Sequence, residues 1–451
     1  MSRPLSVVVL AAGMGTRMKS DLPKVMHKVA GKPMVNHVID AAETLAAHQT
    51  LVVVGPDMDA LRAAVAPHPT FEQTDRLGTA HAVLAAKPAL QKAQETGGNV
   101  IVLYGDSPLF TSATLQRLIA AREDGDCAVA VLGFRALDPT GYGRLVIDPV
   151  SGDLTEIVEE KECDDAQKRI NFCNSGVMCF AASDVIATLE AIGNDNAKGE
   201  YCLTDAVAVA RTRGGRCVAI AVDEQETLGV NSRQQLADAE VIMQNRLRAR
   251  AMENGATLID PASVFLSADT RLGRDVVVEP HVVFGPGVVV GDHVMIKAFS
   301  HLESCVVAAN ADIGPYARLR PGADIGPAAR IGNFVEIKNA VVEAGAKVNH
   351  LSYIGDARIG TDANIGAGTI TCNYNGFLKN HTDIGAGAFI GSNSALVAPV
   401  TIGDGAIVAA GSTISGMVAP DALVMERAPQ VEKPGWAARF RAKMKALKAK
   451  K

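Results

Sequence analysis

The second half of the chain carries apolar residues, almost all of them aliphatic, that recur every six positions. Three such series are Leu272, Val278, Phe284, Val290, Ile296 and Leu302; Ile313, Leu319, Ile325, Ile331 and Ile337; and Ile384, Ile390, Leu396, Ile402, Val408 and Ile414. A period of six fits neither the 3.6-residue turn of an α-helix nor the two-residue alternation of a strand. It is typical of hexapeptide repeats, whose aliphatic side chains point inward and stack on those one coil away. We therefore expect a left-handed parallel β-helix here.

Composition narrows the class of protein. The chain has 451 residues, which favours more than one domain, and 48% are hydrophobic but only 4% aromatic, which suits the narrow interior of a β-helix. A net charge of −5 offers no general basic surface for nucleic acid, so no nucleic-acid partner is expected. No apolar run approaches the length of a membrane span. The N-terminal sequence does not have the pattern of a signal peptide, and the eight cysteines are scattered along the chain. We expect reduced thiols and a cytoplasmic protein without membrane attachment.

The first 230 residues alternate short apolar runs with helical patterns, which predicts a Rossmann-like α/β domain with a mainly parallel sheet. The expected strands are Val7–Leu10, Leu51–Val54, Val100–Leu103 and Ala128–Leu132, and the expected crossover helices include Met34–Ala47 and Ser112–Arg122. Ser232 is a candidate N-cap and Gly255 a candidate stop for one long helix. We predict three parts: a domain over 1–230, a helical linker over 231–254, and the β-helix with a basic tail over 255–451.

Two local signals in the N-terminal domain suggest phosphate and metal binding. The loop Leu10–Met18 contains Gly13 and Gly15, which allow close backbone approach to an anion, while Arg17 adds charge. The loop is not a Walker A motif, because no Gly-Lys-Ser/Thr follows, nor a full dinucleotide fingerprint, because Met18 replaces its last glycine. Asp106 follows an expected strand, where a carboxylate lies in the ligand crevice and can bind Mg²⁺. Taken alone, each signal also fits a simple turn.

Taken together, Leu10–Met18, Lys24, Gln73, Gly78-Thr79-Ala80, Asp106, Gly143, Glu159, Asn174 and Asn231 resemble the sugar-1-phosphate nucleotidyltransferase family. The resemblance implies attack of a sugar phosphate on the α-phosphorus of UTP. Its implied roles are phosphate contact for Gly13, Arg17 and Lys24, uracil recognition for Gln73, Gly78 and Thr79, sugar binding for Gly143, Glu159 and Asn174, and Mg²⁺ binding for Asp106 and Asn231. Leu10, Ala11, Ala12, Tyr104 and Gly105 complete the implied nucleotide site.

The largest break in the six-residue period surrounds Asn364–Gly376. A polar, amide-rich segment displaced from an apolar solenoid is a candidate site, because stability alone does not require it. His350 lies just upstream and can accept a proton from an attacking amine, since the ordinary pKa of histidine is near 6.5. A single histidine is more often structural. Cations and hydrogen-bonding groups within the same few coils favour a functional role: Arg320, Lys338, Tyr353, Asn364 and Lys379.

Over its full length the chain resembles the family of bifunctional N-acetylglucosamine-1-phosphate uridyltransferase/glucosamine-1-phosphate acetyltransferases. The resemblance implies acetyl transfer from acetyl-CoA to glucosamine-1-phosphate, then uridylyl transfer from UTP to N-acetylglucosamine-1-phosphate, giving UDP-N-acetylglucosamine, a cell-wall precursor. It implies His350 as general base, and Arg320, Lys338, Tyr353 and Asn364 as the sugar-phosphate site. The implied acetyl-CoA residues are Ala367, Asn373, Tyr374, Ser392, Ala410 and Arg427, with Lys433 near the CoA phosphates. It also implies homotrimers, with each acetyl-transfer site built where subunits meet.

The chain departs from this family pattern at Met14, where a lysine is common, and in a long basic tail after Trp436. Three other kinds of protein could combine an α/β domain with a β-helix. A nucleotidyltransferase with a scaffolding β-helix would not require His350. A degenerate, non-enzymatic subunit would not keep Arg17, Lys24 and Asp106 together. A zinc-dependent β-helix lyase or hydratase would need histidines aligned on successive coils, and the spacing shows no such alignment.

Overall fold

The computed structural model describes residues 3–196 and 199–449. The chain divides into two compact units, Met1–Ala249 with Leu266–Ala268, and Arg250–Phe265 with Asp269–Lys451. Residues 1–2, 197–198 and 450–451, which belong to the predicted ranges 1–230 and 255–451, lie outside the described residues. No helix of the described residues has both the length and the apolar character needed to cross a membrane.

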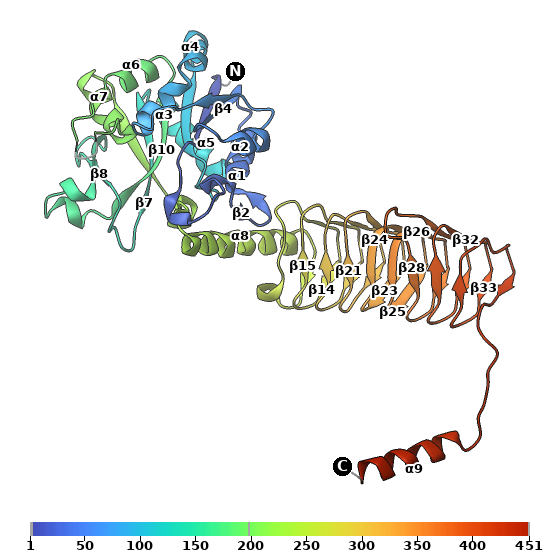
Figure 1. Cartoon of the computed structure of the whole chain (residues 1–451). Helices are drawn as coiled ribbons and strands as arrows, with labels where there is room; N and C mark the ends of the chain where they lie inside the picture. The colour runs from blue at the N-terminus through green and yellow to red at the C-terminus, as the bar shows by residue number, and fades with distance from the viewer. Residues whose placement is uncertain (1–2, 197–198, 450–451) are drawn as a thin grey trace. The chain divides into compact units, whose positions relative to one another are not determined.

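The first unit is built on a mixed, mainly parallel sheet with the strand order β11-β7-β10-β6-β1-β4-β5, and β8 and β9 extend it beside β10 (Figure 1). The strands are β1 (Leu5–Leu10), β4 (Gln49–Val54), β5 (Thr70–Glu72), β6 (Asn99–Tyr104), β7 (Val129–Arg135), β8 (Arg144–Ile147), β9 (Leu154–Val158), β10 (Phe172–Ala181) and β11 (Cys217–Val222), with a small pair, β2 (Lys28–Val29) and β3 (Lys32–Pro33). β1 pairs in parallel with β4 and β6, whereas β10 runs antiparallel between β6 and β7.

Helices cover both faces of this sheet, because alternate residues of its central strands are buried on opposite sides. These helices are α1 (Met34–Glu43), α2 (Asp59–Ala64), α3 (Thr79–Ala85), α4 (Lys87–Thr96), α5 (Ser112–Asp124), α6 (Val185–Glu190) and α7 (Ala206–Thr212), whereas Ala239 of α8 (Arg233–Glu253) packs in a separate small core with Met18 and Val29. Val8 and Val100 share a core with residues of α3, α4, α6 and α7. Val7 and Ile101 share the opposite core with residues of α1, α2 and α5. The predicted α/β domain is confirmed.

Helix α8 begins at the predicted N-cap. The Ser232 hydroxyl oxygen accepts a hydrogen bond from the backbone N–H of Gln235 at 3.2 Å. The side-chain oxygen of Gln235 in turn accepts the backbone N–H of Asn231 at 2.8 Å. This reciprocal arrangement satisfies amide groups that the first helical turn leaves unpaired, and it fixes Asn231 at the start of the helix.

The second unit is a parallel β-helix whose coils have three faces, named A, B and C here in chain order (Figure 1). Face A contains β12 (Thr257–Leu258), β14 (Val277–Val278), β17 (Met295–Ile296), β20 (Asp312–Ile313), β23 (Arg330–Asn333), β25 (Lys347–His350), β27 (Asn364–Ile365), β30 (Phe389–Ile390), β33 (Ile407–Val408) and β35 (Leu423–Val424). Face B contains β15 (Val283–Phe284), β18 (His301–Leu302), β21 (Arg318–Leu319), β28 (Ile370–Cys372), β31 (Ala395–Val397) and β34 (Thr413–Ile414). Face C contains β13 (Arg271–Leu272), β16 (Val289–Val290), β19 (Val306–Val307), β22 (Ala323–Ile325), β29 (Thr382–Ile384) and β32 (Val400–Ile402).

Two longer strands, β24 (Glu336–Val342) and β26 (Tyr353–Ile359), bend from face B onto face C. Apart from the half-buried Leu272, the apolar residues of the six-residue series are buried inside the coils, as Ile313 and Ile331 on face A illustrate. At the corner between faces B and C, the chain leaves the coil after β28 and forms a hairpin. Tyr374 and Lys379 pair in this hairpin as an isolated antiparallel β-bridge. This excursion follows the predicted break in the period. The basic tail forms α9 (Trp436–Lys448).

Candidate functional site

Two adjoining cavities lie at the carboxyl ends of β1 and β6, and both are lined by Thr79, Tyr104, Asp106 and Glu200. One cavity, of about 300 Å³, contains the predicted residues Leu10, Ala11, Ala12, Gly13, Lys24, Gln73, Gly78, Thr79, Tyr104 and Asp106. The other, of about 580 Å³, adds Arg17, Gly143, Glu159, Asn174 and Asn231. Gly105, between Tyr104 and Asp106, is not among the lining residues, and its N–H donates to the Leu10 carbonyl at 2.9 Å. The structure therefore gathers the predicted nucleotide and sugar residues in one region.

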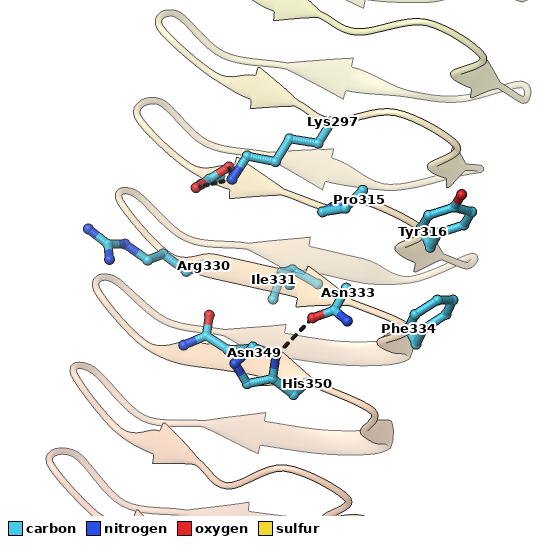
Figure 2. A pocket seen from close by; sticks show the side chains of 12 residues that line it. Lys297, Pro315, Tyr316, Arg330, Ile331, Asn333, Phe334, Asn349 and His350 are labelled. Carbon is cyan, nitrogen blue, oxygen red and sulfur yellow. Dashed lines mark hydrogen bonds and ion pairs between the residues drawn. The ribbon is translucent and has the colours of Figure 1, made fainter.

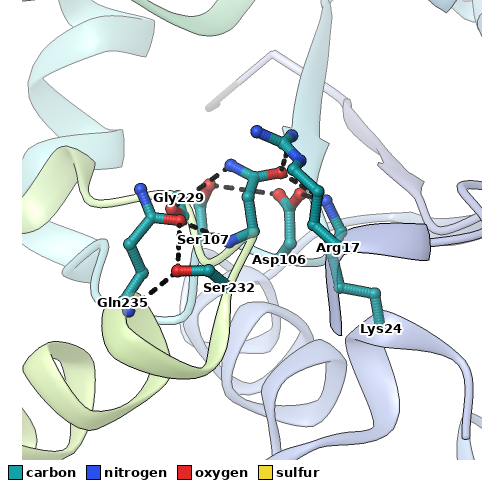
Figure 3. A network of polar contacts seen from close by, with 8 residues as sticks. Arg17, Lys24, Asp106, Ser107, Gly229, Ser232 and Gln235 are labelled. Carbon is teal, nitrogen blue, oxygen red and sulfur yellow. Dashed lines mark hydrogen bonds and ion pairs between the residues drawn. The ribbon is translucent and has the colours of Figure 1, made fainter. Parts of the chain in front are cut away.

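Two cations and two side-chain oxygens meet at the junction of these cavities (Figure 3). The Lys24 ammonium forms an ion pair with Asp106 Oδ2 and donates to Asn231 Oδ1 at 2.9 Å. The Arg17 guanidinium donates to the same Asn231 oxygen, also at 2.9 Å. The Lys24 and Asp106 side chains are only 14% and 17% exposed, so their attraction is less screened than that of a surface pair.

Backbone conformation places Lys24 against the glycine loop. Gly15 has φ of 64°, a left-handed conformation that a larger residue adopts only with strain. A β-carbon at Gly15 would also lie 2.4 Å from the Lys24 β-carbon. Glycine at this position therefore lets the loop and the lysine approach each other.

At the end of the cavity predicted to hold the base, hydrogen bonds fix the loop that precedes α3. The Gln73 side-chain amide donates to the Gly78 carbonyl at 3.0 Å. The Thr79 hydroxyl accepts the Leu203 N–H at 2.9 Å and hydrogen bonds to the Tyr104 phenol. Burial, with the nearby Asp106 carboxylate, raises the pKa of Tyr104 well above its ordinary value, so this phenol remains a neutral hydrogen-bonding group.

The predicted sugar residues lie together at an irregularity in β10. The pairing of β10 with β7 shifts register between Asn174 and Met178, and such a bulge redirects neighbouring side chains. The Asn174 N–H donates to the Gly143 carbonyl at 2.9 Å. A β-carbon at Gly143 would lie 3.6 Å from a carboxylate oxygen of Glu159. The three residues are therefore immediate neighbours on one wall of the larger cavity.

Sequence reasoning missed several residues that line these cavities, among them Arg76 and Glu200. Arg76 lines the smaller one and donates from Nε to the Ala12 carbonyl at 3.0 Å, so it supports the glycine loop directly. Its position between Gln73 and Gly78, two predicted base-binding residues, was the available signal. Glu200 lines both cavities. The side chain of Met14, the departure from the family pattern, is exposed.

In the β-helix, four predicted residues form one column at the corner between faces A and B. Asn333 pairs with His350, and the pairs Val348–Ile365, Ile365–Ile390 and Ile390–Val408 continue the same register. The residues two positions beyond these inward aliphatic residues are His350, Ala367, Ser392 and Ala410. The Arg427 guanidinium donates to the Ala410 carbonyl at 2.8 Å, which ties a fifth predicted residue to the column. Small side chains beside His350 leave room for an extended ligand along this corner.

A group of cations lies at the other end of face B, at the corner with face C. Arg320 and Lys338 follow paired residues of neighbouring coils, Leu319 and Ile337, and Arg320 is bound to Glu336 at 2.7 Å. Lys379, from the hairpin, and then Arg320 lower the pKa of Lys338, because like charges disfavour its protonated form. The Tyr353 phenol lies over Gly355, the register partner of Lys338. An anion bound here would relieve the repulsion between these cations.

The structure does not bring all of the predicted acetyl-transfer residues together in one chain. Asn364 pairs with Lys347 and Phe389 on face A, whereas Arg320, Lys338 and Tyr353 belong to face B near its corner with face C. Asn373 and Tyr374 lie in the hairpin, where the Asn373 amide donates to Asp356. His350 belongs to the opposite corner of face B. The predicted site is thus divided between two corners of the coil.

Comparison with protein families agrees with this architecture. Residues 7–203 match the MobA-like NTP transferase domain, and residues 269–304 and 381–416 match the bacterial transferase hexapeptide family of six repeats. The chain therefore joins a nucleotidyltransferase domain to a hexapeptide-repeat transferase domain, and the predicted left-handed parallel β-helix is confirmed.

Known proteins also match this chain over nearly its whole length. Bifunctional protein GlmU of Paramagnetospirillum magneticum is 58% identical over 451 residues, which are 100% of this chain and 99% of that protein. The GlmU of Xanthobacter autotrophicus is 58% identical, with 98% of each chain covered, and that of Agrobacterium fabrum is 49% identical, with 100% and 99% covered. The chain belongs to the GlmU family of bifunctional proteins. The predicted function is confirmed: the enzyme makes UDP-N-acetylglucosamine by acetyl transfer and uridylyl transfer, with acetyl-CoA and a nucleotide as substrates.

Proposed function

We propose that uridylyl transfer takes place in the paired cavities at the carboxyl ends of β1 and β6. The observation that carries this proposal is that residues with complementary chemistry, drawn from separated parts of the sequence, line one continuous region. Gly13, with Arg17 and Lys24, faces the UTP phosphates. Gln73, Gly78 and Thr79 contact uracil at one end, and Gly143, Glu159 and Asn174 hold the sugar at the other. The protein then contributes mainly positioning and charge neutralisation.

Asp106 and Asn231 are the residues that would hold Mg²⁺. Their side-chain oxygens already converge on one positive charge, the Lys24 ammonium. Nowhere in 3–196 or 199–449 do three or more His, Cys, Asp or Glu side chains gather as a metal site. Mg²⁺ often binds through one or two protein groups together with phosphates and water, so this pair fits it. When bound, the ion would neutralise charge on the reacting phosphates. Lys24 and Arg17 add positive charge beside the same phosphates.

For acetyl transfer, His350 is the general base that takes a proton from the glucosamine amine. Acetyl-CoA lies along the column Ala367, Ser392 and Ala410, whose small side chains allow close backbone contact, and Arg427 binds a CoA phosphate. Arg320, Lys338 and Tyr353 bind the phosphate of the amino sugar, with Lys379 as a further cation. Asn364, Asn373 and Tyr374 contact substrate from face A and from the hairpin. The column beside His350 and the cluster of cations support this assignment.

The division of the acetyl-transfer residues between two corners supports a homotrimer as the working form. The corner that bears His350 in one copy meets the corner that bears Lys338 in the next, and a head-to-tail contact of this kind can close into a ring.

Inactive variants of the two corners, His350→Ala and Lys338→Ala, should then complement each other when the two proteins are unfolded and refolded together. Random mixing gives about one quarter of sites with both native corners, since each is native with probability one half. No recovery of acetyl transfer in the mixture contradicts the shared site.

We propose the cytoplasm as the location of this enzyme, because both co-substrates, UTP and acetyl-CoA, are cytoplasmic metabolites. All eight cysteines are free thiols, which agrees with a reducing compartment. The partners expected are therefore small-molecule substrates and further copies of the same chain. Neither a nucleic acid nor a membrane is among them.

A split assay tests the assignment of the two sites. Pyrophosphate release from UTP and N-acetylglucosamine-1-phosphate is measured beside thiol release from acetyl-CoA and glucosamine-1-phosphate. Asp106→Ala should lose only the first reaction and His350→Ala only the second, each by roughly 10²-fold or more. If His350→Ala retains thiol release, the general base is another residue. If Asp106→Ala retains pyrophosphate release, the proposed metal site is wrong.

A further inference from the structure

Asn333 makes a direct contact with the proposed base. Its side-chain oxygen lies 2.8 Å from Nδ1 of His350 (Figure 2). The two residues are register partners in the parallel pair β23–β25, and neighbouring strands of a sheet are about 4.8 Å apart. A short amide on one coil and an imidazole on the next therefore meet because the β-helix register brings them together.

The chemistry of this contact determines which imidazole nitrogen carries the proton. A side-chain amide oxygen can only accept a hydrogen bond, so the imidazole must donate from Nδ1–H. Nε2 then keeps its lone pair and is the nitrogen that can accept a proton from an amine. A neutral imidazole without this partner can carry its proton on either nitrogen.

The imidazole of His350 has different neighbours on its two sides. The register partner of His350 on one side is Asn333, and the corresponding position on the other side is the small Ala367 of the proposed acetyl-CoA column. Asn333 and His350 also line a cavity of about 520 Å³ on face A. The charged groups that line this cavity are Lys297 and Asp312, which form an ion pair at 2.7 Å, and Arg330. Of the polar groups lining it, Asn333 is the one seen hydrogen-bonded to the imidazole (Figure 2).

We propose that Asn333 is a positioning residue for acetyl transfer: it holds His350 in the Nδ1–H tautomer and fixes the plane of its ring, so that Nε2 faces the amine. This inference rests on the proposed role of His350 as general base. As the amine attacks the acetyl carbonyl, its proton passes to Nε2, and the amide oxygen of Asn333 stabilises the imidazolium through Nδ1–H. Asn333 itself neither gains nor loses a proton.

The test compares Asn333→Ala and Asn333→Asp in the full-length enzyme, with glucosamine-1-phosphate and acetyl-CoA as substrates. Asn333→Ala should lower kcat for acetyl transfer by roughly 10- to 100-fold, with little change in either KM, because the base is misplaced while the substrate contacts remain. Asn333→Asp keeps an acceptor and should recover most of kcat. Its carboxylate favours the imidazolium, so the acidic limb of its pH–kcat/KM profile should move to higher pH.

Controls separate this proposal from a structural effect and from the role of His350. Asn349→Ala removes a neighbouring amide and should leave kcat within about two-fold, and uridylyl transfer should be unchanged in every variant. A wild-type kcat in Asn333→Ala overturns the proposal, as does an Asn333→Asp variant that is equally impaired with an unshifted profile. If His350→Ala retains acetyl transfer, the role of His350 as base fails. If only Asn333→Ala retains it, that role stands and the positioning role of Asn333 fails.

Discussion

Substitution of Gly332 by alanine should impair acetyl transfer but not uridylyl transfer, because it forces two coils apart beside His350. Gly332 immediately precedes Asn333, and a β-carbon built on it would lie 2.0 Å from the Asn349 carbonyl oxygen and 2.8 Å from the Asn349 α-carbon. Both contacts are with backbone, which cannot rotate away as a flexible side chain can. To reach an ordinary contact of about 3.4 Å, the two coils must separate locally by roughly 1.4 Å.

This displacement can be converted into expected effects on stability and rate. Overpacking of a tight interior costs about 1–3 kcal/mol, and for a unit of this size each kcal/mol lowers Tm by about 2–4 °C. The same separation would stretch the 2.8 Å contact between Asn333 and His350 beyond hydrogen-bonding range. A misplacement of about 1 Å at a catalytic group can reduce the rate by about 10²-fold. Thiol release should therefore fall strongly, while pyrophosphate release stays at the wild-type level.

The matched control is Gly416→Ala, because a β-carbon on Gly416, in the same β-helix, meets no atom within 4 Å. This variant should keep the wild-type Tm and both activities. Calorimetry and the two-reaction assay, run on both variants and the wild type, give the comparison. If Gly332→Ala matches the wild type in both Tm and thiol release, the coils tolerate separation and the steric argument is wrong.

Three further predictions concern the proposed binding residues. The neighbours of Lys338 lower its pKa, so its charge is lost as pH rises earlier than for an ordinary lysine; KM for glucosamine-1-phosphate, measured from pH 7 to 10, should rise in the wild type and stay flatter in Lys338→Arg. Ala367→Leu should raise KM for acetyl-CoA by roughly 10-fold or more, because the larger side chain fills the space beside His350 in the column. An unchanged KM would exclude acetyl-CoA from the corner between faces A and B. Arg76→Ala should raise KM for UTP by about 3- to 10-fold, since the Ala12 carbonyl loses its charged donor, and an equal loss of acetyl transfer would point to misfolding instead.

The fold could be predicted from the sequence because its strongest signals are local and repetitive. Stacking of equivalent positions in a β-helix follows directly from the six-residue period, so Ile313 and Ile331 were expected inside the coils. Strand direction was not predictable in the same way. The antiparallel course of β10 depends on which neighbours it joins, and an apolar run alone does not encode this.

The uridylyl-transfer region was predictable in part for a topological reason. Residues that follow parallel strands gather at one edge of the sheet, which explains the meeting of the Gly13 loop with Asp106. Arg76 was missed because a single cation in a loop resembles a solvated residue until its contact with Ala12 is seen.

The acetyl-transfer residues show where reasoning from one chain reaches its limit. His350, Ala367, Ser392 and Ala410 lie 17, 25 and 18 residues apart, so a period of six does not align them, and their column is seen only in the strand register of face A. Arg320 and Lys338, 18 residues apart, do follow the period, and the register places them together at the next corner of the coil. A triangular coil keeps its corners apart, so packing within one chain cannot bring the proposed base, His350, to the cations proposed to bind phosphate. In the proposed homotrimer these two corners are half-sites, and the contact between copies determines how they combine.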